Sequence, residues 1–127
     1  MLRTLVVEDN IGFRESLITL LGGSFSTMVF EKASSSEEAL NKLRQFPPQL
    51  AFVDIHLPGQ NGLQFSKTLR SKYKNAVIVI LTNHDGPEYR QAASQCGADF
   101  FVSKGGSTVD EILGIVNGIV TGTEFQH

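Results

Sequence analysis

The sequence predicts an α/β fold, with a doubly wound parallel β-sheet covered by helices on both faces. Two observations support this class. Short apolar runs alternate along the chain with segments of helical periodicity, in the order βαβαβαβαβα. Most of the apolar runs also lead into a charged or hydroxyl side chain. This is typical of buried parallel strands that bring functional groups to the edge of a sheet.

The predicted strands place polar side chains at one edge of the sheet. Four apolar runs and the polar residues that follow them are 2–7 with Glu8 and Asp9, 49–53 with Asp54, 76–81 with Thr82, and 99–103 with Lys104. A further short strand is expected near residues 27–30. Because parallel strands end at a shared edge, we expect three carboxylates, a hydroxyl and an ammonium group to lie close together there.

The helices are predicted from apolar spacing and from residues that favour helix ends. The first has an apolar stripe from Phe13 to Leu21 and should end at Gly22-Gly23. The second should begin at the serines and glutamates of 34–38 and end at Pro47-Pro48, and the third should span 63–72. The fourth should follow the polar loop 83–87 and carry the small residues Ala92, Ala93 and Cys96. The fifth has the most regular stripe, formed by Val109, Ile112, Leu113, Val116, Ile119 and Val120.

Composition limits the class of protein further. With 127 residues, 41% of them hydrophobic and 19% charged, the chain should form one globular domain, residues 1–127. A net charge of −2 argues against direct nucleic-acid binding by this segment. The lone Cys96 excludes an internal disulfide and fits a reducing compartment. The first apolar run is too short for a signal peptide and no run could span a membrane, so we expect a cytoplasmic location without membrane contact.

The predicted cluster of polar groups points to phosphoryl chemistry. Three carboxylates in one cleft repel one another unless a divalent cation lies among them, and oxygen ligands suit Mg²⁺. Zinc is not expected, because neither histidine nor cysteine accompanies these acids. With Thr82 and Lys104 beside the cation, the site could bind a phosphoryl group and stabilise its transfer to Asp54, which would form an aspartyl-phosphate.

In the order and spacing of these residues the chain resembles the receiver domain of a two-component response regulator over essentially all of its length. The resemblance implies a flavodoxin-like (βα)5 fold with a five-stranded parallel sheet in the order 2-1-3-4-5. It implies that Asp54 is the phosphoacceptor and that Glu8, Asp9, Asp54 and the backbone carbonyl of His56 bind Mg²⁺. It further implies that Thr82 and Lys104 contact the phosphoryl group, that Thr82 and Phe101 are switch residues, and that Pro58 and Gly62 form the turn after Asp54.

The same resemblance implies a function in signal transduction. A sensor histidine kinase would phosphorylate Asp54, and the surface formed by the fourth helix, fifth strand and fifth helix would then change. The domain would catalyse its own phosphorylation and dephosphorylation and is not expected to be an enzyme with other substrates. Residues 96–104 resemble the subgroup that precedes a helix-turn-helix DNA-binding domain. If the natural chain is longer, we therefore expect such an output domain and control of transcription. The changed surface could also form a homodimer.

Some residues depart from the family pattern and leave alternatives open. Asn83 stands where a small residue is usual, and Gly105 follows Lys104 where many receivers have proline. His56, Asn83 and His84 are candidates for tuning the lifetime of the phosphoryl group. The alternative within the family is a degenerate receiver that acts as a phosphorylation-independent interaction module. A Mg²⁺-dependent phosphatase would need a second acid in place of His56. A flavodoxin-like electron carrier would need a phosphate-binding loop in place of Glu8 and Asp9.

Overall fold

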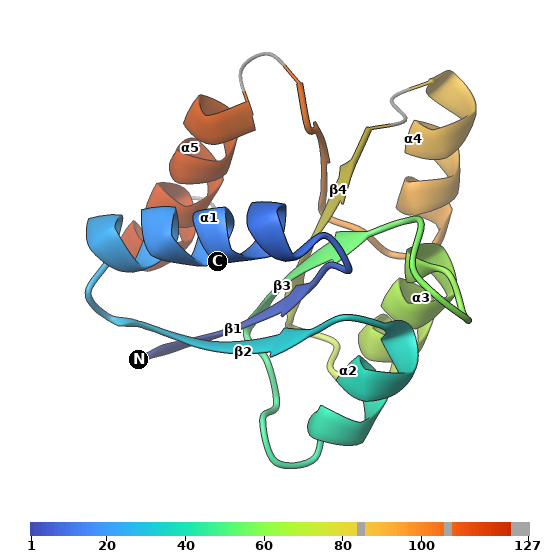
Figure 1. Ribbon diagram of the computed structural model, residues 1–127, viewed down its shortest axis with the longest axis horizontal. Helices are drawn as coiled ribbons and strands as arrows, with labels where there is room; N and C mark the ends of the chain where they lie inside the picture. Colours follow the sequence, from blue (N-terminus) through green and yellow to red (C-terminus); the bar gives the residue numbers. More distant parts are fainter. Residues whose placement is uncertain (84–85, 106–107, 123–127) are drawn as a thin grey trace.

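The computed structural model describes residues 1–83, 86–105 and 108–122, and its architecture confirms the predicted α/β class (Figure 1). Strands and helices alternate along the chain. The elements are β1 (Leu2–Val7), α1 (Ile11–Ser24), β2 (Met28–Ala33), α2 (Ser36–Lys42), β3 (Leu50–Asp54), α3 (Gly62–Lys72), β4 (Val77–Thr82), α4 (Pro87–Gln95), β5 (Phe100–Ser103) and α5 (Thr108–Thr121). Among the described residues, no helix is both long and apolar enough to cross a membrane.

The five strands form one parallel sheet in the order β2-β1-β3-β4-β5, as predicted. The chain runs from β1 to the edge strand β2 and then returns to β3 on the other side of β1. The strand order therefore reverses between β1 and β3, and this is where open α/β sheets form a crevice at the carboxyl ends of their strands. Glu8, Asp9 and Asp54 all lie at this position.

Each face of the sheet has its own core, because successive strand residues point to opposite faces. Phe52 belongs to the core that includes residues of α1 and α5, whereas Val53 belongs to the core that includes residues of α2, α3 and α4. Figure 1 shows the same division, with α1 and α5 on one face of the sheet and the other three helices on the opposite face. All five residues of the central strand β3 are buried, which explains its nearly continuous apolar sequence.

Side-chain caps fix the first turns of the helices near the site. Asn10 accepts a hydrogen bond from the backbone N–H of Phe13 at the start of α1, and Asn61 does the same for Gln64 at the start of α3. Ser35 accepts from the N–H of Glu38 and so caps α2. Each cap fixes the first turn of its helix, and at α1 and α2 only a few residues separate this turn from the preceding strand.

Three predicted boundaries were wrong. Helix α1 continues through Gly22-Gly23 to Ser24, because Leu21 is buried and Phe25 packs on the same core, which outweighs the glycine cost of about 1 kcal/mol each. Helix α2 ends at Lys42, before the predicted stop at Pro47-Pro48. Strand β2 extends to Ala33, beyond the predicted 27–30, because it pairs with the full length of β1.

Candidate functional site

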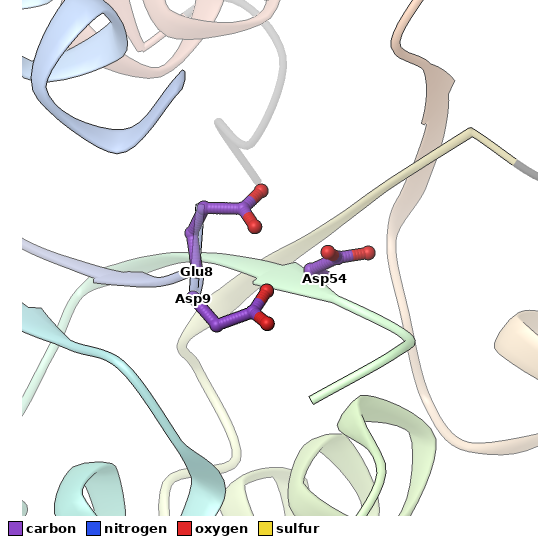
Figure 2. A group of neighbouring side chains, drawn as sticks. All are labelled: Glu8, Asp9 and Asp54. Carbon is purple, nitrogen blue, oxygen red and sulfur yellow. The ribbon is translucent and has the colours of Figure 1, made fainter. Parts of the chain in front are cut away.

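Three carboxylates meet at the ends of β1 and β3. Glu8 and Asp9 follow the last residue of β1, and Asp54 is the last residue of β3. Each offers one carboxylate oxygen, and these three oxygens all lie within 4.8 Å of one another. Figure 2 shows the side chains of Glu8 and Asp9 extending towards the same space as that of Asp54. Glu8 is 2% exposed and Asp54 8%, whereas Asp9 is exposed, so the cluster is buried on one side and open on the other.

Lys104 brings a positive charge to the same cluster. Its ammonium group pairs with Glu8 Oε1 and lies 3.2 Å from Asp54 Oδ2, while its side chain is only 8% exposed. Its backbone N–H donates a 2.9 Å hydrogen bond to the carbonyl of Thr82, which ties the residue to the end of β4. The structure thus brings together the acids and the ammonium group that were predicted from separate strands.

The electrostatics of the cluster favour a cation. Burial raises the pKa of Glu8 above its usual range, and the neighbouring Asp54 carboxylate adds to this rise. The Lys104 ammonium and the N–H of Asn10 lower the pKa of Glu8 and partly oppose the effect. With all groups ionised, three carboxylates face one ammonium, which leaves two negative charges uncompensated. A divalent cation would balance this charge, and the cluster offers it only oxygen ligands.

Thr82 ends β4 at the same edge of the sheet. It is fully buried and lies in register with Ser103, the last residue of β5. Asn83 follows it and is exposed. The prediction for His84 falls outside the described residues.

Helix α4 contacts two of the predicted site residues. The guanidinium carbon of Arg90 lies 4.7 Å from the ring centroid of Phe101, which is half-buried against the core on the α2, α3 and α4 face. The exposed His56 meets Tyr89 edge-on, with ring centroids 6.0 Å apart. The β3–α3 loop and β5 are therefore both linked to α4 through ring contacts.

Gly62 permits the close approach of α3 to Asp54. Its N–H donates a 2.8 Å hydrogen bond to the carbonyl of Ile55. A Cβ atom at this position would lie 1.8 Å from the carbonyl oxygen of Asp54 and 2.9 Å from a methyl group of Val53. Only glycine fits between the start of this helix and the backbone of the strand that carries Asp54.

Two residues of α1 that support the cluster were not predicted from the sequence. Arg14 is buried and its Nη1 donates to the carbonyl of Glu8 at 3.2 Å and to the hydroxyl of Ser34 at 2.6 Å. The burial of Arg14 could have been predicted, because this residue lies at helical spacing from the buried Leu17 and Leu21. Phe13, which was assigned only to the apolar stripe, also has its ring beside the Lys104 ammonium group.

The comparisons with known proteins agree with this fold. A family model of the response regulator receiver domain matches residues 4–117. The chain therefore belongs to the response regulator receiver domain family of two-component systems.

Two curated relatives and one solved structure show the degree of similarity. The chain is 30% identical over 121 residues to the Fimbriae Z protein of Salmonella typhimurium, which covers 95% of this chain and 57% of that protein. It is 35% identical over 103 residues to the two-component response regulator PhoP of Pseudomonas aeruginosa, which covers 81% and 45%. The structure of a LuxR-family two-component response regulator from Aurantimonas sp. SI85-9A1 matches with a TM-score of 0.83 and 26% identity, over 94% of this chain and 85% of that one. The chain spans about half the length of the curated relatives it matches.

Proposed function

We propose that this receiver domain accepts a phosphoryl group on Asp54 in a Mg²⁺-dependent reaction. The observation that carries the proposal is the arrangement around Asp54, where two further carboxylates and the Lys104 ammonium group converge at the carboxyl edge of the sheet. A phosphoryl acceptor needs a nucleophilic oxygen with positive charge beside it, and Asp54 offers the oxygen while Lys104, together with a bound divalent cation, would offer the charge.

The donor set fits Mg²⁺, because the described cluster contains carboxylate oxygens and no nitrogen or sulfur ligand. Glu8, Asp9 and Asp54, with the backbone carbonyl of His56, would hold the ion. When bound, Mg²⁺ supplies positive charge that stabilises the negative charge spread over the transferring phosphoryl group.

Residues of the chain then carry out the transfer of the phosphoryl group. A carboxylate oxygen of Asp54 attacks phosphorus in line with the bond to the donor, which is the imidazole nitrogen of a sensor kinase or the oxygen of a small acyl phosphate. That bond breaks, and its electron pair leaves with the donor atom. The ammonium group of Lys104, which lies between Glu8 and Asp54, pairs with the new phosphoryl oxygens. The hydroxyl of Thr82 donates a hydrogen bond to another of these oxygens.

Thr82 and Phe101 are proposed to couple phosphorylation of Asp54 to a change in the surface of α4, β5 and α5. As Thr82 moves towards the phosphoryl group, Phe101 turns inward and leaves its contact with Arg90. The surface of α4, β5 and α5 would then repack, which is a two-state change biased by a local charge. His56, Asn83 and His84 remain candidates for tuning the lifetime of the phosphoryl group.

The partners follow from the same proposal. A sensor histidine kinase would be the donor, a homodimer could form through α4, β5 and α5, and a DNA-binding output domain would follow in a longer natural chain, in a cytoplasmic signalling protein. The match to a LuxR-family response regulator supports the output domain. A degenerate receiver and a phosphatase are less well supported, because the acid cluster and Lys104 are complete while the second acid that a phosphatase needs is replaced by His56.

Beryllofluoride, an analogue of the phosphoryl group, tests the proposal. We expect a bound fluorine NMR signal when both Mg²⁺ and beryllofluoride are added to the wild-type protein. The signal should be absent without Mg²⁺ and in Asp54→Asn. A folded wild-type protein that gives no bound signal under these conditions would disprove the assignment of the site.

A further inference from the structure

The Lys104 ammonium group has an aromatic neighbour that no part of the proposed reaction uses. Its Nζ lies 4.5 Å from the ring centroid of Phe13, while the same atom contacts Glu8 and Asp54. The carboxylates come from the ends of β1 and β3, and the ring comes from the first turn of α1. The cation is thus held between acidic groups and the face of a ring, which attracts positive charge through its quadrupole.

We propose that Phe13 is a positioning residue that keeps the Lys104 ammonium group over the phosphoryl site. The inference rests on the proposed function, because it assigns Phe13 a role through the lysine that contacts the phosphoryl group. Phe13 itself does not touch the reacting atoms.

The backbone of Phe13 is fixed relative to the acid pair. Its N–H donates a 2.9 Å hydrogen bond to the side chain of the capping residue Asn10, and the N–H of Asn10 donates to Glu8 Oε2 at 3.1 Å. The ring is half-buried and packs against the core on the α1 and α5 face. The position of the ring therefore follows from the same turn that positions Glu8.

The residue that follows Lys104 adds no packing beside the lysine side chain. The next residue is the exposed Gly105, and a Cβ atom there would meet no described atom within 4 Å. Gly105 therefore provides neither the rigid ring of a proline nor a packed side chain next to Lys104. The four-carbon stem of the lysine is itself flexible. The backbone on either side of Lys104 is held by the Thr108 hydroxyl, which donates to the carbonyls of Ser103 and Gly105, so the part left to restrain is the side chain, and the aromatic face restrains its ammonium end.

An aromatic face also suits a group that must move. On phosphorylation the ammonium group has to shift its pairing from Glu8 towards the phosphoryl oxygens. A hydrogen bond would be lost in such a shift, whereas the attraction of a ring face changes little over small lateral displacements. Leucine at this position would keep the apolar packing but would not attract the cation.

The test compares Phe13→Leu, Phe13→Tyr and site-specific fluorinated phenylalanines at position 13, which weaken the ring quadrupole at nearly constant shape. Phe25→Leu is the matched control, since Phe25 packs against the same core at the other end of α1. The measurements are the rate of phosphorylation by a small acyl phosphate with Mg²⁺, and the proton NMR shift of the Lys104 ε-methylene group.

We expect Phe13→Leu to slow phosphorylation by about three- to tenfold, the effect of one partly desolvated cation–π contact. The upfield ring-current shift of Lys104 should disappear in this variant, while Phe13→Tyr keeps both properties and Phe25→Leu changes neither. The rate should fall with each added fluorine. Rates that do not depend on fluorination, or a Phe13→Leu variant as fast as wild type, would overturn the positioning role of Phe13 and leave the proposed function intact. A wild-type protein that takes up no phosphoryl group would instead overturn the proposed function.

Discussion

Replacing Gly62 by alanine should damage the fold and the site together. The new Cβ would lie 1.8 Å from the carbonyl oxygen of Asp54 and 2.7 Å from its carbonyl carbon. Contacts under 3.0 Å between a Cβ atom and backbone atoms essentially never occur in folded proteins, so the start of α3 and the end of β3 must separate by about 1.2 Å. Both segments are anchored by neighbouring residues, and the 2.8 Å hydrogen bond from Gly62 to Ile55 would be strained.

The size of the effect follows from three terms. Alanine gains about 1 kcal/mol over glycine in a helix. Overpacking costs about 1–3 kcal/mol, and the upper end applies because the clash is with backbone atoms. The weakened hydrogen bond adds about 1 kcal/mol. We therefore expect Gly62→Ala to lower the free energy of unfolding by about 2–3 kcal/mol, which lowers the Tm by roughly 6–12 °C in a domain of this size.

Urea and thermal unfolding measure this loss, and Mg²⁺-dependent beryllofluoride binding measures the displacement of Asp54. Binding should weaken at least tenfold, because a shift of about 1 Å at a reacting group costs up to about a hundredfold in rate. Gly114→Ala is the matched control. It is an exposed glycine of α5 whose Cβ would meet no described atom within 4 Å, so this variant should gain about 0.5–1 kcal/mol. A Gly62→Ala protein that matches wild type in both stability and binding would show that this position tolerates a Cβ atom.

Three further predictions concern other parts of the domain. Ser66→Ala in α3 should raise the free energy of unfolding by about 1 kcal/mol in urea melts, because the buried hydroxyl of Ser66 has no hydrogen-bond partner among the described residues; a loss of stability would contradict this. Lys104→Gln should bind Mg²⁺ about tenfold more tightly by calorimetry, because removal of the ammonium group leaves all three carboxylates free to face the ion; unchanged or weaker binding would contradict it. The N–H of Lys32 and the Lys42 ammonium lower the pKa of Glu31, so its contribution to stability is present above the unfolded pKa and is lost as pH falls through the lower folded pKa. The stability difference between wild type and Glu31→Gln should therefore shrink as the pH falls below the usual glutamate pKa of 4.5, and a difference that stays constant as the pH is lowered further would refute this.

The fold and the arrangement of the cluster follow from local patterns that are strong in this chain. Strands that are buried on both faces of the sheet appear in the sequence as apolar runs. The polar residues that follow them can be assigned to the carboxyl edge of the sheet without knowledge of any tertiary contact. The cluster of Glu8, Asp9 and Asp54 is a consequence of this rule. The strand order 2-1-3-4-5 came from the family resemblance, since the alternation of elements alone does not distinguish between strand orders.

The features that the sequence did not reveal depend on tertiary contacts. Gly22-Gly23 would end an isolated helix, but the burial of Leu21 and the packing of Phe25 carry α1 past them. Charged residues at the end of β2 hid its length, because on an edge strand Glu31 can face Lys42 instead of the core. The contact of Phe13 with Lys104 joins residues far apart in the sequence and has no local signal.

Phosphorylation of Asp54 is measured by intact mass after incubation with Mg²⁺ and a small acyl-phosphate donor. We expect the wild-type protein to gain one phosphoryl group, and no gain by Asp54→Asn or in the presence of a chelator. A folded wild-type protein that gains nothing, or an Asp54→Asn variant that gains as much as wild type, would contradict the assignment of Asp54 as the phosphoacceptor.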